Sequence, residues 1–165
     1  MRTENIFKIE LQKVIAEYSE DTLTITAKEI IVAYCEGFKK MRKNQIEGLI
    51  AVTLNTSELK RMNSTVIPFI SNQRYKNHKD KPENWTWAFK LEGTKKDLGE
   101  KLMDVIKGQK EQAKLLVEDL TEKYSKYLAD NKIKKKWSDY AEIQLIKDFV
   151  THIVSWYYSL DILPR

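Results

Sequence analysis

The N-terminal third of the chain repeats apolar residues at helical spacing. Residues 3–19 place apolar side chains three and four positions apart, with charged residues elsewhere on the helical wheel, which predicts an amphipathic helix. A second helix, over about 26–54, is predicted to begin at Thr26, because Thr26 and Glu29 have the spacing of a capping box. Residues 22–26 alternate between polar and apolar, which indicates a short strand or an extended connector between the two helices.

The C-terminal part of the chain returns to the helical pattern. One apolar stripe runs from Leu98 to Tyr127 in steps of three and four, which predicts a helix of roughly 45 Å at 1.5 Å per residue. After a turn at Asp130 and Asn131, a last helix has an apolar face wider than a surface helix needs. We therefore expect the last helix to be the central helix of the core, or part of its face to contact another subunit in an oligomer.

The middle of the chain, residues 55–93, has a different pattern. It is rich in asparagine and contains Pro68 and Pro82. The apolar run around Pro68 favours an edge strand or a packed loop over a helix, because proline has no N–H to donate. From Trp85 to Leu91 apolar and polar residues alternate, which predicts a half-buried strand, paired either within the chain or with another chain.

Taken together, these patterns predict a mainly α protein. We expect a helical bundle of four to five helices, with a short β element at about 85–91 and an irregular basic insertion at 55–84. The chain has 165 residues, of which 42% are hydrophobic and 32% charged. That length and composition are typical of one soluble globular domain, which predicts a single helical domain over 1–165 with 55–93 as its irregular, basic, β-containing region.

The cysteines, histidines and apolar segments indicate where the protein is located and what it binds. The single cysteine, Cys35, excludes an internal disulfide and is typical of a reducing compartment. The N-terminus has no apolar signal segment, and no run of 18 apolar residues occurs, so the sequence predicts a cytoplasmic protein with no membrane partner. Two histidines and one cysteine, far apart, predict no zinc site, and we expect no cofactor because no cofactor motif is present.

Positive charge is concentrated in one part of the sequence. Residues 37–82 hold ten basic and three acidic residues, a net charge of +7, whereas the whole chain carries +5. Such segregation creates an electric field with a direction, and this field attracts polyanions. The sequence therefore favours a small nucleic-acid-associated protein that binds RNA or single-stranded nucleic acid, or that is a subunit of a nucleoprotein complex.

The candidate nucleic-acid contacts belong to the same stretch. Lysine and arginine bind phosphates, while tyrosine and histidine stack on unpaired bases. The first cluster is expected on a helix and the last on a loop. The predicted contact residues are Lys39, Lys40, Arg42, Lys43, Arg61, Arg74, Tyr75, Lys76, His78 and Lys79.

Two other functions account for parts of the same pattern. A non-enzymatic interaction module, such as an inhibitor, immunity protein or adaptor, uses segregated positive charge to dock on an acidic protein surface. A metal-independent ribonuclease needs an acid–base pair, and Arg74 with His78, aided by Lys76, is the only local candidate. No catalytic motif supports the second function, so an enzyme is the less favoured interpretation.

Overall fold

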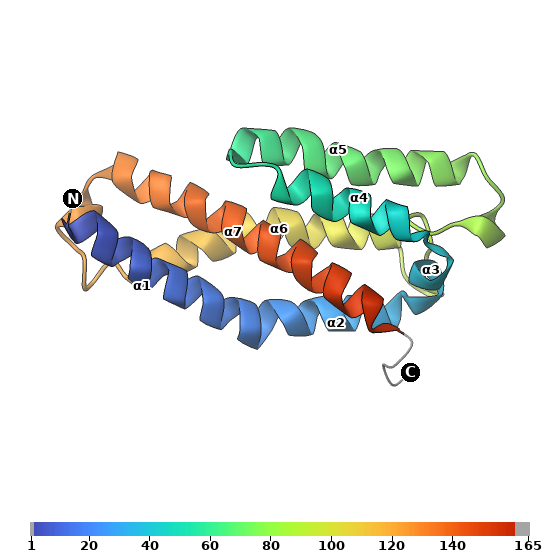
Figure 1. Cartoon of the computed structure of the whole chain (residues 1–165), viewed down its shortest axis with the longest axis horizontal. Helices are drawn as coiled ribbons and strands as arrows, with labels where there is room; N and C mark the ends of the chain where they lie inside the picture. Colours follow the sequence, from blue (N-terminus) through green and yellow to red (C-terminus); the bar gives the residue numbers. More distant parts are fainter. Residues whose placement is uncertain (1, 161–165) are drawn as a thin grey trace.

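The computed structural model describes residues 2–160, and these residues form an elongated arrangement of helices (Figure 1). A π-helical turn, η1, joins the first two helices, and short 3₁₀ turns, η2 and η3, flank α6. The elements in chain order are α1 (Arg2–Tyr18), η1 (Ser19–Leu23), α2 (Thr24–Ala33), α3 (Cys35–Lys40), α4 (Lys43–Leu54), α5 (Leu59–His78), η2 (Pro82–Asn84), α6 (Leu98–Glu118), η3 (Tyr127–Ala129) and α7 (Asn131–Tyr158). The mainly α prediction is confirmed.

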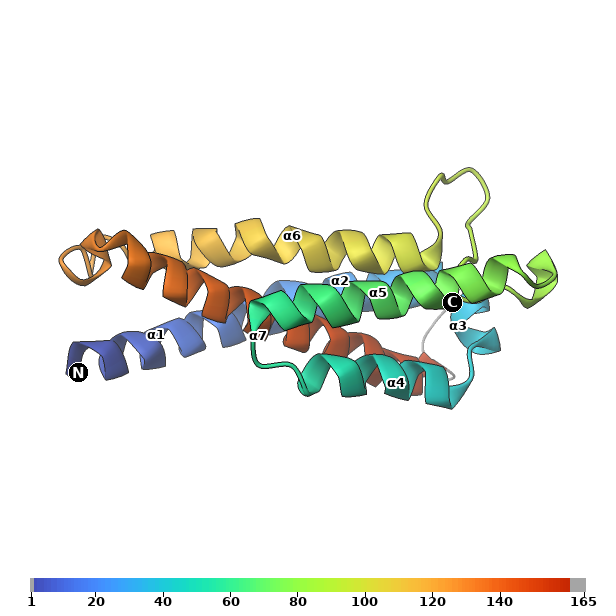
Figure 2. The same ribbon diagram turned by 90° about the horizontal axis from the view of Figure 1, so that it is seen from above.

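Helix α7 lies at the centre of this arrangement. It packs against α6, α2 and α4, and also against α5 and α1 (Figures 1 and 2). Its apolar side chains face several of these neighbours at once, so they are buried on more than one side of the helix. This explains the wide apolar face seen in the sequence. The most deeply buried of these side chains are Ala141, Leu145, Ile146, Phe149, Val150 and Ile153.

The predicted second helix is divided into three. Tyr34, at φ −100° and ψ 25°, leaves helical geometry between α2 and α3. Met41 and Arg42 are both extended, which separates α3 from α4. Met41 is nevertheless buried, and its carbonyl accepts a hydrogen bond from the Tyr157 hydroxyl at 3.0 Å. The break therefore turns the basic segment outward while the apolar stripe stays in the core.

The prediction of an irregular basic region at 55–84 is wrong over most of its length. Residues Leu59–His78 form helix α5, and Pro68 lies inside this helix. Pro68 itself is exposed, whereas Met62, Val66 and Ile70 are fully buried. The apolar stripe at helical spacing thus outweighs the local cost of proline, which lacks one backbone donor.

The predicted strand at 85–91 is not present either. Within residues 2–160, the only β pairing is an isolated bridge between Lys90 and Asp97. The segment is a loop in which Trp87 and Ala88 are buried, and the apolar run around Pro68, expected as an edge strand or a packed loop, is helical. The alternating apolar residues belong to a loop that folds back onto the bundle. The backbone N–H and C=O groups of this loop are therefore satisfied without a sheet.

None of the helices within the described residues combines the length and the apolar character needed to cross a bilayer.

Candidate nucleic-acid interface

A polar cleft lies where α3, the start of α4 and the end of α5 meet. Figures 1 and 2 show these three segments at the same end of the molecule. The cleft has a volume of about 550 Å³ and draws its lining from both halves of the basic stretch. Its lining residues are Lys40, Arg42, Gln45, Asn77, Asp80, Asn84 and Thr86. We call this cleft the end cleft.

The break between α3 and α4 positions the two basic residues of the end cleft. The Lys40 ammonium donates a hydrogen bond to the Glu83 carbonyl at 2.7 Å, which ties α3 to the turn after α5. The Arg42 backbone N–H donates to Gln45 Oε1 at 3.0 Å and so caps the start of α4. Within residues 2–160 the Arg42 guanidinium has no ion pair or hydrogen bond, so its donors face solvent.

The amide groups of the end cleft have their acceptors largely occupied. Asn77 Oδ1 accepts hydrogen bonds from the backbone N–H groups of Thr86 and Ala88 at 3.0 and 2.9 Å. Gln45 Oε1 is occupied by the Arg42 N–H. Because these two amide oxygens are used, the NH₂ groups of Asn77 and Gln45 are what the two side chains offer to a ligand. The third amide, Asn84, donates its NH₂ group to Asp80 Oδ1 at 3.2 Å. Two cations and the NH₂ groups of Gln45 and Asn77 favour an anion, with Asp80 as the opposing charge.

Further basic side chains lie on the elements that form the end cleft, although Lys39 and Lys43 line a separate pocket with Tyr157 and Tyr158. Lys39 lies 3.5 Å from Glu36 and Lys43 lies 3.9 Å from Glu47, each within one turn of the same helix. Lys79 lies over the ring of Tyr75, 4.4 Å from its centroid. Exposed pairs of this kind contribute about 0–1 kcal/mol, so these side chains exchange their partners readily for a phosphate. Lys76, next to Asn77 in the chain, is exposed too.

Arg74 differs from the other candidate residues because it is committed to ion pairs. Its Nε donates to both carboxylate oxygens of Asp97 at 2.9 Å, and its Nη2 lies 3.0 Å from Glu100 Oε1. These hydrogen bonds raise the pKa of Arg74 above its ordinary value. The side chain is 25% exposed, so Arg74 holds α5 to the start of α6 and has few donors left for a ligand.

Arg61 and His78 do not line the end cleft. Arg61 is in the first turn of α5, 16 residues before Asn77, which corresponds to about 24 Å along the helix. His78 is exposed at the other end and packs edge-on against Trp85, with ring centroids 4.7 Å apart. Since Arg74 is bound by carboxylates and His78 contacts an indole ring, the two do not form a joint acid–base site.

Five residues of the lining are not among the contacts predicted from the sequence: Gln45, Asn77, Asp80, Asn84 and Thr86. They meet Lys40 and Arg42 because α4 begins beside the end of α5. Within the described part of the chain, no three histidine, cysteine, aspartate or glutamate side chains are grouped as metal ligands would be.

Comparisons of this chain with protein-family models, curated proteins and solved structures found no match.

Proposed function

We propose that this protein binds RNA or single-stranded nucleic acid through the end cleft and the lysines around it. The observation that supports this most directly is that Lys40 and Arg42 share one cleft with the amide groups of Gln45 and Asn77. These residues come from segments more than 30 positions apart in the sequence. Cations bind phosphate oxygens, and amide donors bind phosphate, sugar or base acceptors, so the set suits a nucleic-acid backbone.

Aromatic residues at the end of α5 and in the loop after it support binding of a single strand. Tyr75 is 62% exposed, and its ring already lies beneath the Lys79 ammonium. Trp85 is half-buried and holds His78 against its edge. Unpaired bases stack on such rings, and stacking on an aromatic side chain contributes about 1–3 kcal/mol per base. A duplex has its bases already stacked, so it gains less from these rings.

The size of the surface limits the affinity. A single strand that crosses the end cleft contacts about three to four phosphates, which gives a slope of about −2 to −3 in a plot of log K against log salt concentration. Binding in the micromolar range is therefore expected at low salt and is expected to weaken strongly at physiological salt. A subunit of a nucleoprotein complex does not need more than this, because neighbouring subunits add contacts of their own.

Fluorescence anisotropy with a labelled single-stranded RNA of 12 nucleotides tests the proposal. The double variant Lys40→Glu with Arg42→Glu reverses the charge of the cleft, and we expect it to weaken binding at least about tenfold. The matched control is Lys60→Glu with Arg61→Glu, which makes the same charge change at the far end of α5. We expect this control to retain most of the affinity.

Two results would contradict the proposal. One is the absence of any binding to RNA or single-stranded DNA at 20–50 mM salt, since that range is about where electrostatic contacts are strongest. The other is an equal loss in the two double variants, which would mean that net charge alone governs binding. Circular dichroism of each variant verifies that the helical content is retained.

An acidic protein surface is the alternative partner, because the same cations steer a protein with complementary charge. Affinity capture from the native host, with and without nuclease treatment, separates the two. Loss of the captured partners after nuclease supports nucleic acid, and retention of an acidic protein that releases at high salt supports the interaction module.

A further inference from the structure

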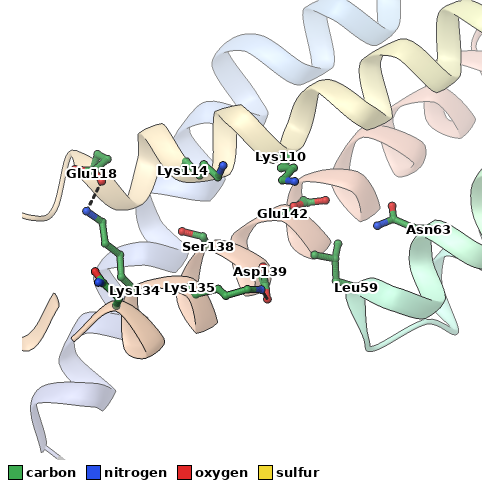
Figure 3. A pocket seen from close by; sticks show the side chains of 11 residues that line it. Leu59, Asn63, Lys110, Lys114, Glu118, Lys134, Lys135, Ser138, Asp139 and Glu142 are labelled. Carbon is green, nitrogen blue, oxygen red and sulfur yellow. Dashed lines mark hydrogen bonds and ion pairs between the residues drawn. The ribbon is translucent and has the colours of Figure 1, made fainter. Parts of the chain in front are cut away.

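A second cavity lies between α6 and α7, away from the end cleft. Its volume is about 510 Å³, which is within the range of about 300–1,000 Å³ typical of small-molecule sites. Helix α6 contributes Lys110 and Lys114 to one wall, and the start of α5 closes one end with Leu59 and Asn63 (Figure 3). The opposite wall comes from α7. We call this cavity the α6–α7 groove.

The groove contains one buried carboxyl group. Glu142 of α7 lines it and is only 7% exposed. Burial, followed by the charge of Asp139, raises the pKa of Glu142, while Lys110 and Lys114 oppose the shift. Across residues 2–160, no ion pair or hydrogen bond reaches its carboxylate. The carboxylate faces the groove and not a protein donor, so a cationic group of a ligand in the groove can pair with it.

Most other charges along the groove are paired with each other. Lys134 pairs with Glu118, and Lys135 pairs with Asp139 at 2.8 Å. Lys110 differs because no carboxylate within the described residues lies within ion-pair distance of it, and Figure 3 shows it next to Glu142. The groove therefore offers one carboxylate and one ammonium that are close together but not in direct contact.

This arrangement selects the charge of a ligand. A simple anion is repelled by Glu142, and a simple cation is repelled by Lys110 and Lys114. A ligand with an amino group and an anionic group at its two ends satisfies both, since each of its charges meets an opposite one. Leu59 and the methylene stems of the lysines provide apolar contact for the rest of the ligand.

We propose that the α6–α7 groove is a binding site for a zwitterionic small molecule of the amino-acid class. The ligand's ammonium group binds Glu142, and its carboxylate or phosphate group binds Lys110 and Lys114. The site is independent of the end cleft, because the two cavities share no residue. A nucleic-acid strand, which carries only negative charge, does not satisfy Glu142.

Titration of the full chain with a panel of zwitterions tests the proposal. The probes are the twenty free amino acids and O-phosphoethanolamine. Two-dimensional amide NMR of the protein measures its response to each probe. We expect at least one probe to cause saturable shifts at residues of α6 and α7 that line the groove. The N-acetylated form of that probe, which lacks the ammonium group, is expected to cause no such shifts. Acetate alone and methylamine alone are expected to cause none either.

Two variants assign any binding to Glu142. Glu142→Gln removes the buried charge and retains the shape, so we expect it to fold and to bind the probe at least tenfold more weakly. Glu122→Gln makes the same change at an exposed position after α6, outside the lining of the groove, and is expected to bind as the unaltered protein does. In the unaltered protein the probe is also expected to lower the pKa of the Glu142 carboxyl, measured from its side-chain carbon resonance.

Three results would overturn the proposal. They are the absence of saturable shifts with every probe, equal binding of the N-acetylated form, and equal binding by Glu142→Gln. Failure of RNA binding at the end cleft leaves this test unaffected.

Discussion

The guanidinium group of Arg74 and the carboxylate of Asp97 form the principal polar link between α5 and α6. Arg74 Nε contacts both oxygens of Asp97, and Asp97 is 1% exposed. Asp97 also begins α6 as its N-cap, since its Oδ1 accepts the Glu100 backbone N–H at 2.8 Å. One carboxylate thus caps a helix and anchors a second helix to it, which makes the pair part of the framework of the fold.

Removal of either partner is expected to destabilise the protein through the charge that is left behind. Arg74→Met retains the apolar stem but leaves Asp97 buried and uncompensated, so we expect a loss of about 3 kcal/mol in the free energy of unfolding. Asp97→Asn retains capping ability and is expected to cost a similar amount. The double variant is expected to lose less than the sum of the two, as measured by urea unfolding. Additive losses would show that the two side chains are not coupled.

Two glycines of α6 provide a matched pair of substitutions with opposite expected signs. A Cβ atom at Gly99 would lie 2.5 Å from Arg74 Cδ and 3.1 Å from the Trp87 carbonyl oxygen. A Cβ atom at Gly108 would meet nothing within 4 Å. Gly99 therefore permits the close approach of Arg74 to the start of α6, whereas Gly108 has no such role.

We expect Gly99→Ala to destabilise the protein by about 1–3 kcal/mol, because the added methyl group displaces Arg74 and presses on a backbone carbonyl. Gly108→Ala is expected to stabilise it by about 0.5–1 kcal/mol, the usual gain from alanine in a helix. Thermal or urea unfolding measures both. Stabilisation by both substitutions would show that the contact at Gly99 relaxes without cost.

The helices could be predicted from the sequence where their apolar stripes are regular. Helix α7 is an example, because its wide apolar face indicated a helix surrounded by others. Helix α5 was missed, since Pro68 has a strong local preference against helix and the stripe of Met62, Val66 and Ile70 is sparse. The prediction followed the local preference of proline against helix. In the folded protein, burial of the apolar stripe outweighs this preference.

The candidate site could be predicted only in part, because charge along a sequence says nothing about pairing in space. Lys40 and Arg42 meet Asn77 across the end cleft, which requires the α3–α4 break to lie beside the end of α5. The partner of Arg74, Asp97, lies 23 residues later in the chain, just before the helix predicted from Leu98. A single sequence contains no signal for such a pair.

Asn77 is expected to be essential for the loop that follows α5. Its side-chain oxygen accepts three hydrogen bonds, from the N–H and hydroxyl groups of Thr86 and from the N–H of Ala88. Thr86 and Ala88 are 5% and 1% exposed, so their N–H groups cannot turn to water. We expect Asn77→Ala to cost about 3 kcal/mol in unfolding free energy, since two buried donors lose their acceptor.

The controls separate the role of the acceptor from that of the residue type. Asn77→Asp retains the oxygen atoms and is expected to remain close to the unaltered protein in stability, while the added negative charge weakens RNA binding at the end cleft. Asn72→Ala, at an exposed position of the same helix, is expected to change stability by less than about 0.5 kcal/mol. Amide hydrogen exchange at Thr86 and Ala88 measures the loop directly, and unchanged exchange in Asn77→Ala contradicts this account.

Ser19, Asp148 and His152 form a partly buried polar cluster where the π-helical turn η1 packs on α7. Ser19 Oγ lies 2.7 Å from His152 Nε2. Burial lowers the pKa of His152, although the charges of Asp148 and Glu20 oppose the shift. Burial also raises the pKa of Asp148, opposed by a hydrogen bond from Ser19 and by the charge of His152.

The two shifts affect stability in opposite directions as pH falls. Because the pKa of His152 is lowered in the folded protein, the unfolded chain takes up that proton first, and stability decreases below about pH 6.5. Because the pKa of Asp148 is raised, the folded protein takes up that proton first, and stability is regained as pH falls further.

We therefore expect urea unfolding to show that His152→Gln loses less stability than the unaltered protein between pH 7 and 5.5, with His78→Gln as the control for loss of the exposed histidine. Asp148→Asn is expected to be more stable than the unaltered protein near pH 7 and to lack the regain of stability at lower pH. An unaltered pH profile of stability in both His152→Gln and Asp148→Asn would show that the cluster does not titrate with folding.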